Sequence, residues 1–284
     1  MSTLLTIGEL LARTATFFKN KEIDQPRLTA EVLLCHVVGL ERIQLYVRFD
    51  QPMEESEVDR YRDMVKKRIE GLPVAYILEE KEFMGHSFKV TPAVLVPRPD
   101  TEFLVEAGIR YLKEIEEPRF LDICTGSGAI LLSVLKEVEN AKGIGTDLSP
   151  EALKIAKENS LRLEVGDRAG FLLGDLLEPV GDRKVHGIFS NPPYIPTKDM
   201  AGLQVEVKKE PMMALDGGMD GLDFYRRLLT QAEKHLLPNG FLLMEVGIHQ
   251  AQPVTEIAET LGWKTLEKPI CDYGGIERVV LFSR

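Results

Sequence analysis

Cysteine is scarce in this sequence, and spacings typical of metal ligands are missing. Only three cysteines, Cys35, Cys124 and Cys271, occur in 284 residues, and no two of them form a C-x-x-C pair. The five histidines show no H-E-x-x-H or similar spacing. A zinc site or a disulfide framework normally requires one of these patterns. We therefore predict no metal site.

Long hydrophobic runs and an excess of basic residues are also missing. No apolar run reaches the roughly 18–20 residues that span a bilayer, and the N-terminus shows no signal-peptide pattern. The 35 Lys and Arg residues are outnumbered by 45 Asp and Glu residues, which gives a formal net charge of −10. Unaided binding to a phosphate backbone usually needs a basic face. We therefore expect a cytoplasmic protein with no membrane partner and no direct binding of nucleic acid.

The sequence does contain an ordinary globular balance, with 44% hydrophobic and 28% charged residues. Residues 1–75 have helical periodicity and predict a small helical bundle. Its first apolar stripe consists of Ile7, Leu10, Leu11, Thr14, Ala15 and Phe18. A second helix is expected from Pro26 to Gly39, with Asp24 as a possible N-cap. A further helix is expected to stop at Gly71, after an apolar face that consists of Val58, Tyr61, Val65 and Ile69.

Residues 76–97 change to β-forming character and predict a β-hairpin linker. Phe83, Phe88 and Val90 favour strands, whereas Gly85 and Pro92 interrupt them. Residues 98–284 then alternate short apolar strands with helical stretches, which indicates a parallel, doubly wound α/β sheet. The expected strands are 120–124, 143–146, 171–173, 187–190 and 241–246, and the expected helices include 129–137 and 150–161.

The last part of the chain departs from this alternation. Two strand-like runs, 264–269 and 278–282, are joined by a short turn at Gly274-Gly275 that leaves no room for a crossover helix. We therefore expect them to be antiparallel neighbours. An open parallel sheet that ends in an antiparallel pair is the Rossmann-like sheet of S-adenosylmethionine-dependent methyltransferases, and we predict that fold for residues 98–284.

A glycine-rich turn is expected where the first strand of this sheet meets the first helix. Gly126 and Gly128 let the backbone turn tightly and approach a ligand, outside the carboxyl ends of the strands, where open α/β sheets bind ligands. Leu131 stands where a dinucleotide fingerprint has its third glycine, which favours S-adenosylmethionine over a nicotinamide cofactor. The turn by itself is also compatible with a purely structural role.

Acidic residues at the ends of three strands suit the same cofactor. Asp122 can attract a cationic amino-acid group. Asp147 follows the turn by about 20 residues, the spacing of a carboxylate that holds ribose hydroxyls. Asp175 is placed to accept from an adenine amino group, and Leu176 to cover the ring.

The sequence Asn191-Pro192-Pro193-Tyr194 ends the fourth strand beside the same crevice. The Asn191 side-chain oxygen and the Pro192 carbonyl are two acceptors on a rigid path, which suits a planar NH2 group with two hydrogens. Tyr194 offers a flat face for stacking. Because an amide or aromatic amine nitrogen is a poor nucleophile, two acceptors would orient its lone pair and stabilise the developing positive charge. No strong base is needed for this chemistry.

Over nearly its whole length, the chain resembles the release-factor glutamine methyltransferases, the HemK-type protein-(glutamine-N5) methyltransferases. The stretches that carry the resemblance are Pro73–Leu78, Phe88–Pro92, Val96–Glu102, Asp122–Ala129, Ser190–Pro196, Ala214–Gly218 and Asp220–Tyr225. The Asn-Pro-Pro-Tyr element alone is shared with adenine-N6 and other amino methyltransferases, whereas the combination is far more specific.

The resemblance implies that the protein methylates the glutamine of the Gly-Gly-Gln loop in peptide chain release factors, with N-terminal helices that engage the release factor. It implies S-adenosyl-L-methionine as cofactor and S-adenosyl-L-homocysteine as product. The expected cofactor-binding residues are Asp122, Cys124, Thr125, Gly126, Ser127, Gly128, Asp147, Leu148, Asp175, Leu176 and Asn191. The expected substrate-binding residues are Asn191, Pro192, Pro193, Tyr194 and Arg98, of which Asn191, Pro192 and Tyr194 are expected to be catalytic.

The chain departs from the family pattern at four positions. Cys124 and Glu79 stand where glycine is usual or common, Leu176 where some members carry tryptophan, and Asp100 where glutamate is usual. None of them touches Asn191–Tyr194. Three alternatives stay open on the residues alone: an amino methyltransferase that acts on adenine or guanine of RNA or DNA, a regulator that binds an adenosyl ligand without turnover, and a nicotinamide oxidoreductase.

Overall fold

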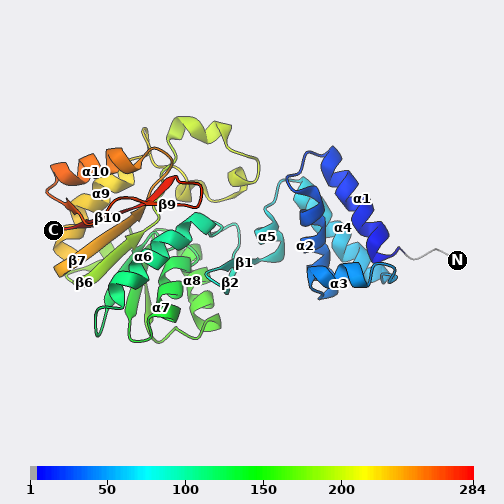
Figure 1. The fold of residues 1–284 in the computed structure, drawn as a ribbon, viewed down its shortest axis with the longest axis horizontal. Helices are drawn as coiled ribbons and strands as arrows, with labels where there is room; N and C mark the ends of the chain where they lie inside the picture. The colour runs from blue at the N-terminus through cyan, green and yellow to red at the C-terminus, as the bar shows by residue number, and fades with distance from the viewer. Residues whose placement is uncertain (1–4) are drawn as a thin grey trace. The chain divides into compact units, whose positions relative to one another are not determined.

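The computed structural model describes residues 5–284, and the chain divides into two compact units (Figure 1). One unit contains the chain up to Glu80 together with Val205–Lys209. The other contains Lys81–Gln204 and Glu210–Arg284. No helix in the described part of the chain is both long and apolar enough to cross a membrane.

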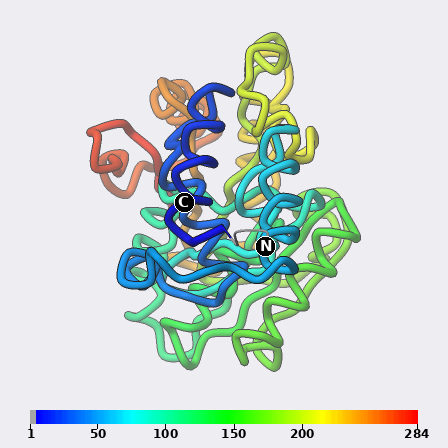
Figure 2. The backbone as a smooth tube through the Cα atoms, turned by 90° about the vertical axis from the view of Figure 1, so that its right-hand side faces the viewer, coloured from blue at the N-terminus to red at the C-terminus, as the bar shows by residue number. Residues whose placement is uncertain are grey.

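The first unit is helical, as the sequence predicts. Its helices are α1 (Ile7–Asn20), α2 (Pro26–Val38), α3 (Arg42–Val47), α4 (Glu55–Ile69) and α5 (Val74–Leu78). Figure 2 shows them in blue and cyan, and their shared apolar core includes Leu11, Phe18, Leu33, Leu34 and Tyr61. The helix α1 begins in a capping box, in which the side chains of Thr6 and Glu9 each accept from the other's backbone N–H.

Details of this unit differ from the sequence prediction. The N-cap of α2 is Gln25 in a left-handed conformation, not Asp24, whose side chain accepts instead from the Gln25 N–H. Ile69 is exposed, whereas Arg68 is buried and pairs with Glu206, so the inner face of α4 ends one residue earlier than expected. The helices α3 and α5 are too short to show a period in the sequence.

A two-stranded hairpin opens the second unit. Its strands are β1 (Glu80–Phe83) and β2 (His86–Lys89), joined through Met84 and Gly85, which both have positive φ. The hairpin is shorter than expected, because residues 94–96 form no strand; Val94 and Val96 instead contribute buried side chains. Asn159 anchors β2: its Oδ1 accepts from the Lys89 N–H at 2.7 Å, and its Nδ2 donates to Lys89 O at 3.0 Å and Ser127 O at 2.9 Å.

The main sheet has the strand order β5-β4-β3-β6-β7-β10-β8, with β9 paired to β10. Its strands are β3 (Arg119–Ile123), β4 (Lys142–Asp147), β5 (Ala169–Leu173), β6 (Val185–Ser190), β7 (Leu236–Glu245), β8 (Lys264–Thr265), β9 (Ile270–Cys271) and β10 (Glu277–Ser283). The strands from β5 to β7 are parallel, and β10 is antiparallel to β7, β8 and β9. The predicted parallel sheet with a terminal antiparallel pair is confirmed.

Helices cover both faces of this sheet (Figure 1). Alternate residues of each strand point to opposite faces, so Phe120 packs with α6 (Glu102–Leu112) and α7 (Ala129–Glu137), whereas Leu121 packs with α9 (Asp223–Ala232) and α10 (Ala251–Thr260). Helix α8 (Pro150–Arg162) packs beside β5 and β4. The arrangement leaves the carboxyl ends of the parallel strands open for a site.

Candidate active site

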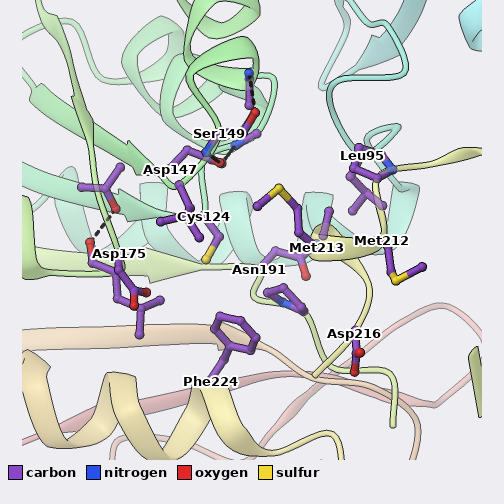
Figure 3. Close-up of a pocket in the computed structure, with 18 of the residues that line it drawn as sticks. Leu95, Cys124, Asp147, Ser149, Asp175, Asn191, Met212, Met213, Asp216 and Phe224 are labelled. Atoms are coloured by element: carbon purple, nitrogen blue, oxygen red, sulfur yellow. Dashed lines mark hydrogen bonds between the residues drawn. The ribbon is translucent and has the colours of Figure 1, made fainter. Parts of the chain in front are cut away.

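A cavity of about 930 Å³ lies at the carboxyl ends of the parallel strands (Figure 3). Cys124 follows β3, Asp147 ends β4, Asp175 follows β5 and Asn191 follows β6, and all four residues line the cavity. Four separate strands therefore bring together residues that the sequence analysis selected. Gly126, Leu148, Leu176 and Pro193 also line the cavity.

Hydrogen bonds to the buried side chain of Asp122 hold the glycine turn in place. Gly126 and Gly128 have φ of 55° and 80°, and Cys124 has φ of 63°, a conformation that glycine adopts with less strain. Asp122 is fully buried, and its Oδ2 accepts from Thr125 Oγ1 at 2.6 Å and from the Leu131 N–H at 3.2 Å. Its burial raises the pKa of the carboxyl to about 7.

Part of the predicted cofactor set therefore lies behind the cavity wall. Asp122, Thr125, Ser127 and Gly128 are not among the lining residues. Ser127 supports the turn through its backbone oxygen, which accepts from Asn159. The expectation that Asp122 contacts the cofactor stays a prediction, and the structure gives its carboxyl a bracing role within the turn.

Asp147 joins the glycine turn to the end of β4. Its Oδ2 accepts from the Gly126 N–H at 2.8 Å, and its Oδ1 accepts from the Ser149 N–H at 2.9 Å. Burial raises the pKa of this carboxyl, and the backbone donors oppose that shift. Because a carboxylate has about four acceptor positions, Asp147 can still accept from hydroxyl groups in the cavity.

The third strand end presents Asp175 together with two residues that the sequence analysis missed. Asp175 forms an ion pair with Arg227, whose guanidinium carbon lies 5.9 Å from the centre of the Phe224 ring. Phe224 and Arg227 come from α9 and line the cavity beside Asp175. Phe224 lies in the stretch Asp220–Tyr225 that carries the family resemblance but was not selected as a site residue, and Arg227 lies outside that stretch; α9 brings both to the site through tertiary packing. Leu176 is buried, whereas Leu148 is exposed on the rim.

Asn191 has one bonded and one free end. Its Nδ2 donates to Thr101 Oγ1 at 3.2 Å, whereas its Oδ1 is buried without a partner in the region from residue 5 onward. Figure 3 shows Asn191 between Cys124 and the turn that carries Met212 and Met213. A buried acceptor without a partner is costly unless a ligand or water supplies a donor.

The backbone after Asn191 is fixed by two neighbouring segments. The Ile195 N–H donates to Leu215 O at 2.9 Å, and Gln250 Nε2 donates to Tyr194 O at 2.9 Å. Gly217 lies so close that a Cβ atom there would be 2.7 Å from Tyr194 Cα. The path of the Asn-Pro-Pro-Tyr element is therefore closely determined.

Three further residues that were expected to bind the substrate, Pro192, Tyr194 and Arg98, do not line the cavity. Pro192 is buried and does not line the cavity. Tyr194 packs against the core that α9 and α10 share, and burial raises the pKa of its hydroxyl. Arg98 is not a lining residue either: its guanidinium binds the buried carboxylate of Glu210, whose other oxygen accepts from the Val96 N–H at 3.0 Å.

The cavity suits S-adenosylmethionine on three observations. Its volume falls in the range of about 300–1,000 Å³ that is usual for small-molecule sites. A Cβ atom on Gly126 would meet nothing within 4 Å, so the turn leaves open space for a ligand. Several apolar side chains share the lining with four carboxylates, Asp147, Asp175, Asp216 and Asp223. Among residues 5–284, no group of three or more His, Cys, Asp or Glu side chains could hold a metal ion.

The chain is similar to known proteins over most of its length. A family model described as the PrmC N-terminal domain matches residues 9–78, and one described as the methyltransferase small domain matches residues 100–208. The release factor glutamine methyltransferase of Moorella thermoacetica is 40% identical over 284 residues, which are 100% of this chain and 99% of its own length. That of Geobacter sulfurreducens is 41% identical over 279 residues, 97% of this chain and 95% of its own.

Two solved structures share the fold at low identity. The catalytic domain of hMettl16, in complex with a 3'UTR hairpin, matches with a TM-score of 0.58 at 16% identity, over 81% of this chain and 82% of that chain. The ribosomal protein L11 methylase of Lactobacillus delbrueckii subsp. bulgaricus matches with a TM-score of 0.50 at 19% identity, over 69% and 83%. At these identities the likeness concerns the fold alone.

Proposed function

The chain belongs to the release factor glutamine methyltransferases, and on that premise we propose that it methylates the side-chain amide nitrogen N5 of the glutamine in the Gly-Gly-Gln loop of peptide chain release factors. The observation that carries the proposal is the buried, unpartnered Oδ1 of Asn191 at the cavity. A primary amide supplies the donor that this oxygen lacks.

The residues that would hold the cofactor surround the other part of the cavity. The backbone of Cys124–Gly128 would approach it closely, Asp147 would accept from its ribose hydroxyls, and Asp175 with Leu176 would face its adenine. Leu148 and Asn191 complete this lining, and Asp122 would act through the turn that it braces. When bound, S-adenosylmethionine supplies a methyl group on a positively charged sulfur.

The chain's own contribution to the reaction is orientation and charge stabilisation. Asn191 Oδ1 would accept one hydrogen of the substrate amide, and the Pro192 carbonyl would accept the other. Both acceptors stabilise positive charge as it develops on the nitrogen. Holding the reacting groups in line can contribute up to about 7–11 kcal/mol of the barrier. Tyr194 would border the amide, and the Arg98–Glu210 ion pair would support the segment beside it.

We further propose that the helical unit recognises the release factor. Three exposed side chains on α3 support this role, since Ile43, Tyr46 and Val47 are 67%, 49% and 80% exposed. Exposed apolar side chains that gather on one short helix are typical of interaction sites. With a partner in translation and a net charge of −10, we expect action in the cytoplasm without direct binding of nucleic acid.

The competing prediction, methylation of an adenine or guanine amino group, would use the same two acceptors. The test therefore offers full-length protein and methyl-labelled S-adenosylmethionine three substrates in parallel: an unmodified release factor, RNA and DNA. A second release factor, with its loop glutamine changed to asparagine, is the matched control. We expect label in the unmodified release factor alone. Label in nucleic acid, or equal label in the asparagine control, would overturn the proposed substrate.

A further inference from the structure

Which end of the Asn191 amide faces the cavity decides whether it can bind a substrate NH2 group. The oxygen and nitrogen ends of an amide have nearly the same shape, so partners must fix the orientation. On the cavity side Oδ1 has no partner within the described chain. The orientation of the Asn191 amide must therefore be fixed by residues of the protein around its nitrogen end.

Behind Asn191 lie Thr101 and Glu245, both almost fully buried at 4% and 2% exposure. Asn191 Nδ2 donates to the Thr101 hydroxyl oxygen at 3.2 Å. Glu245 follows Met244, which pairs with Ser190 across β6 and β7, so Glu245 stands next to Asn191 at the ends of these two strands. Its buried Oε2 has no hydrogen-bond partner within the described residues. An ionised carboxylate only accepts hydrogen bonds, so it favours an Asn191 amide that turns its NH2 group, and not its oxygen, toward it.

We propose that Thr101 and Glu245 are positioning residues that hold the Asn191 amide with its nitrogen toward the protein and its oxygen toward the substrate. The role of these two residues in the reaction depends on the proposed function. With the amide flipped, Oδ1 would face the Glu245 carboxylate, which only accepts, and a donor would face the NH2 group of the substrate. The substrate side of Asn191 would then lose its hydrogen bond, and two acceptors would face each other on the protein side.

Three separate segments bring this group together. Thr101 ends the short 3₁₀ turn η1 (Pro99–Thr101) before α6, Glu245 ends β7, and Asn191 follows β6. The segment that contains Thr101 follows the hairpin, far from Asn191 in the sequence. The motif Asn-Pro-Pro-Tyr therefore depends on two residues outside it for the orientation of its first side chain.

The arrangement also predicts a pH effect. Burial raises the pKa of Glu245 to about 7; the charged groups that act on it are Asp100, which raises the pKa, and Arg278, which lowers it. Tyr194 and Tyr225 lie in its field and stay neutral, because burial raises the pKa of each hydroxyl. Below pH 7, protonated Glu245 can donate a hydrogen bond, so the flipped amide is no longer opposed.

The first test compares Thr101→Val, which removes the hydroxyl at nearly constant size, with Thr101→Ser, which keeps it. Full-length variants are assayed with release factor and S-adenosylmethionine. We expect Thr101→Val to lower kcat about tenfold or more while KM for the release factor stays within about twofold. The calorimetric Kd for the cofactor should also hold, and Thr101→Ser should keep most of kcat. An unchanged kcat in Thr101→Val, or equal losses in both variants, would overturn the proposal.

A second measurement needs no substrate and so separates this inference from the proposed function. Hydrogen exchange of the Asn191 side-chain NH2, assigned in ¹⁵N NMR spectra by comparison with Asn191→Ala, reports whether its nitrogen faces the protein. Because amide exchange is catalysed by hydroxide, the measured rate is compared with that of free asparagine at the same pH. We expect strong protection at pH 8, and weaker protection both at pH 6 and in Glu245→Gln at pH 8. Fast exchange in the unaltered protein at pH 8 would show that the nitrogen faces the cavity and would refute the proposed orientation.

Discussion

The side-chain nitrogen of Asn191 lies 3.2 Å from the hydroxyl oxygen of Thr101, a residue 90 positions earlier in the chain. This contact joins the end of β6 to the turn before α6, and it occupies the donor end of the amide. The acceptor end, Oδ1, is buried without a partner among the residues described, and Asn191 is one of the residues that line the cavity. The chemistry that we propose follows from this division between a bonded end and a free end.

Removing the free acceptor should abolish most of the activity. We expect Asn191→Ala to lower kcat by about 10²–10³-fold, as is usual when one donor or acceptor of a charge-stabilising site is lost. The melting temperature should fall only modestly, because the change removes the Nδ2 hydrogen bond to Thr101, whereas Oδ1 has no partner to lose. Steady-state methylation of the release factor measures the effect, and exposed Lys198→Ala on the following segment is the control. A kcat close to that of the control would contradict the role of Asn191.

Asp147 should contribute to cofactor affinity rather than to the chemical step. Asp147→Asn keeps an oxygen but loses the charge, and charge-assisted hydrogen bonds are roughly twice as strong as neutral ones. We expect the Kd for S-adenosylmethionine to rise about tenfold, equivalent to about 1.4 kcal/mol. Calorimetry measures this directly. Unaltered affinity would mean that Asp147 serves only the backbone donors of Gly126 and Ser149.

Gly217 should be required for the path of the Asn-Pro-Pro-Tyr element. In Gly217→Ala the new Cβ would lie 2.7 Å from Tyr194 Cα, and backbone atoms cannot move aside cheaply. We expect a loss of about 1–3 kcal/mol in the free energy of unfolding, the usual cost of overpacking, together with reduced kcat. Gly202→Ala is a matched control, because a Cβ there meets nothing within 4 Å. Equal stability of the two variants in chemical denaturation would argue against a tight contact.

Glu245 should make stability fall as pH rises. Its pKa is raised from an ordinary 4.5 to about 7 in the folded protein, so between these values the folded state binds more protons than the unfolded state. The free energy of unfolding therefore decreases across this window and levels off above pH 7.

Glu245→Gln removes this contribution. The stability of the variant relative to the unaltered protein should increase by about 2 kcal/mol between pH 5 and pH 8. Comparing the two proteins at each pH cancels the contributions of groups that they share, such as Asp122, whose pKa is also raised to about 7. A relative stability that is the same at both pH values would show that Glu245 is ionised throughout.

Local patterns determined much of the fold, whereas the support of the site could not be predicted from the sequence. Helix α7 has the predicted bounds, because a glycine turn and an apolar run define it locally. The strand ends at Asp147 and Asn191 meet as expected, since the carboxyl ends of parallel strands share one edge. Glu245, by contrast, resembles an ordinary strand residue, and Thr101, although it lies in the Val96–Glu102 stretch that carries the resemblance, shows no local sign of its contact with Asn191. Only tertiary packing brings them to Asn191.

Two arginines, Arg98 and Arg227, also show what could not be predicted from the sequence. Arg98 was expected among the substrate-binding residues, yet its guanidinium forms an ion pair with buried Glu210. Arg227 has no motif around it, yet it lines the cavity and pairs with Asp175. The partner of a charged side chain depends on distant segments, so sequence spacing does not identify it.

The most direct test of the account is to locate the transferred methyl group. Tandem mass spectrometry of a release factor, after incubation with the protein and S-adenosylmethionine, measures both the mass gain and its position. We predict a single methyl group on the side-chain amide of the loop glutamine, and none with Asn191→Ala. A methyl group on any other residue, or an unmodified release factor alongside methylated nucleic acid, would contradict the account.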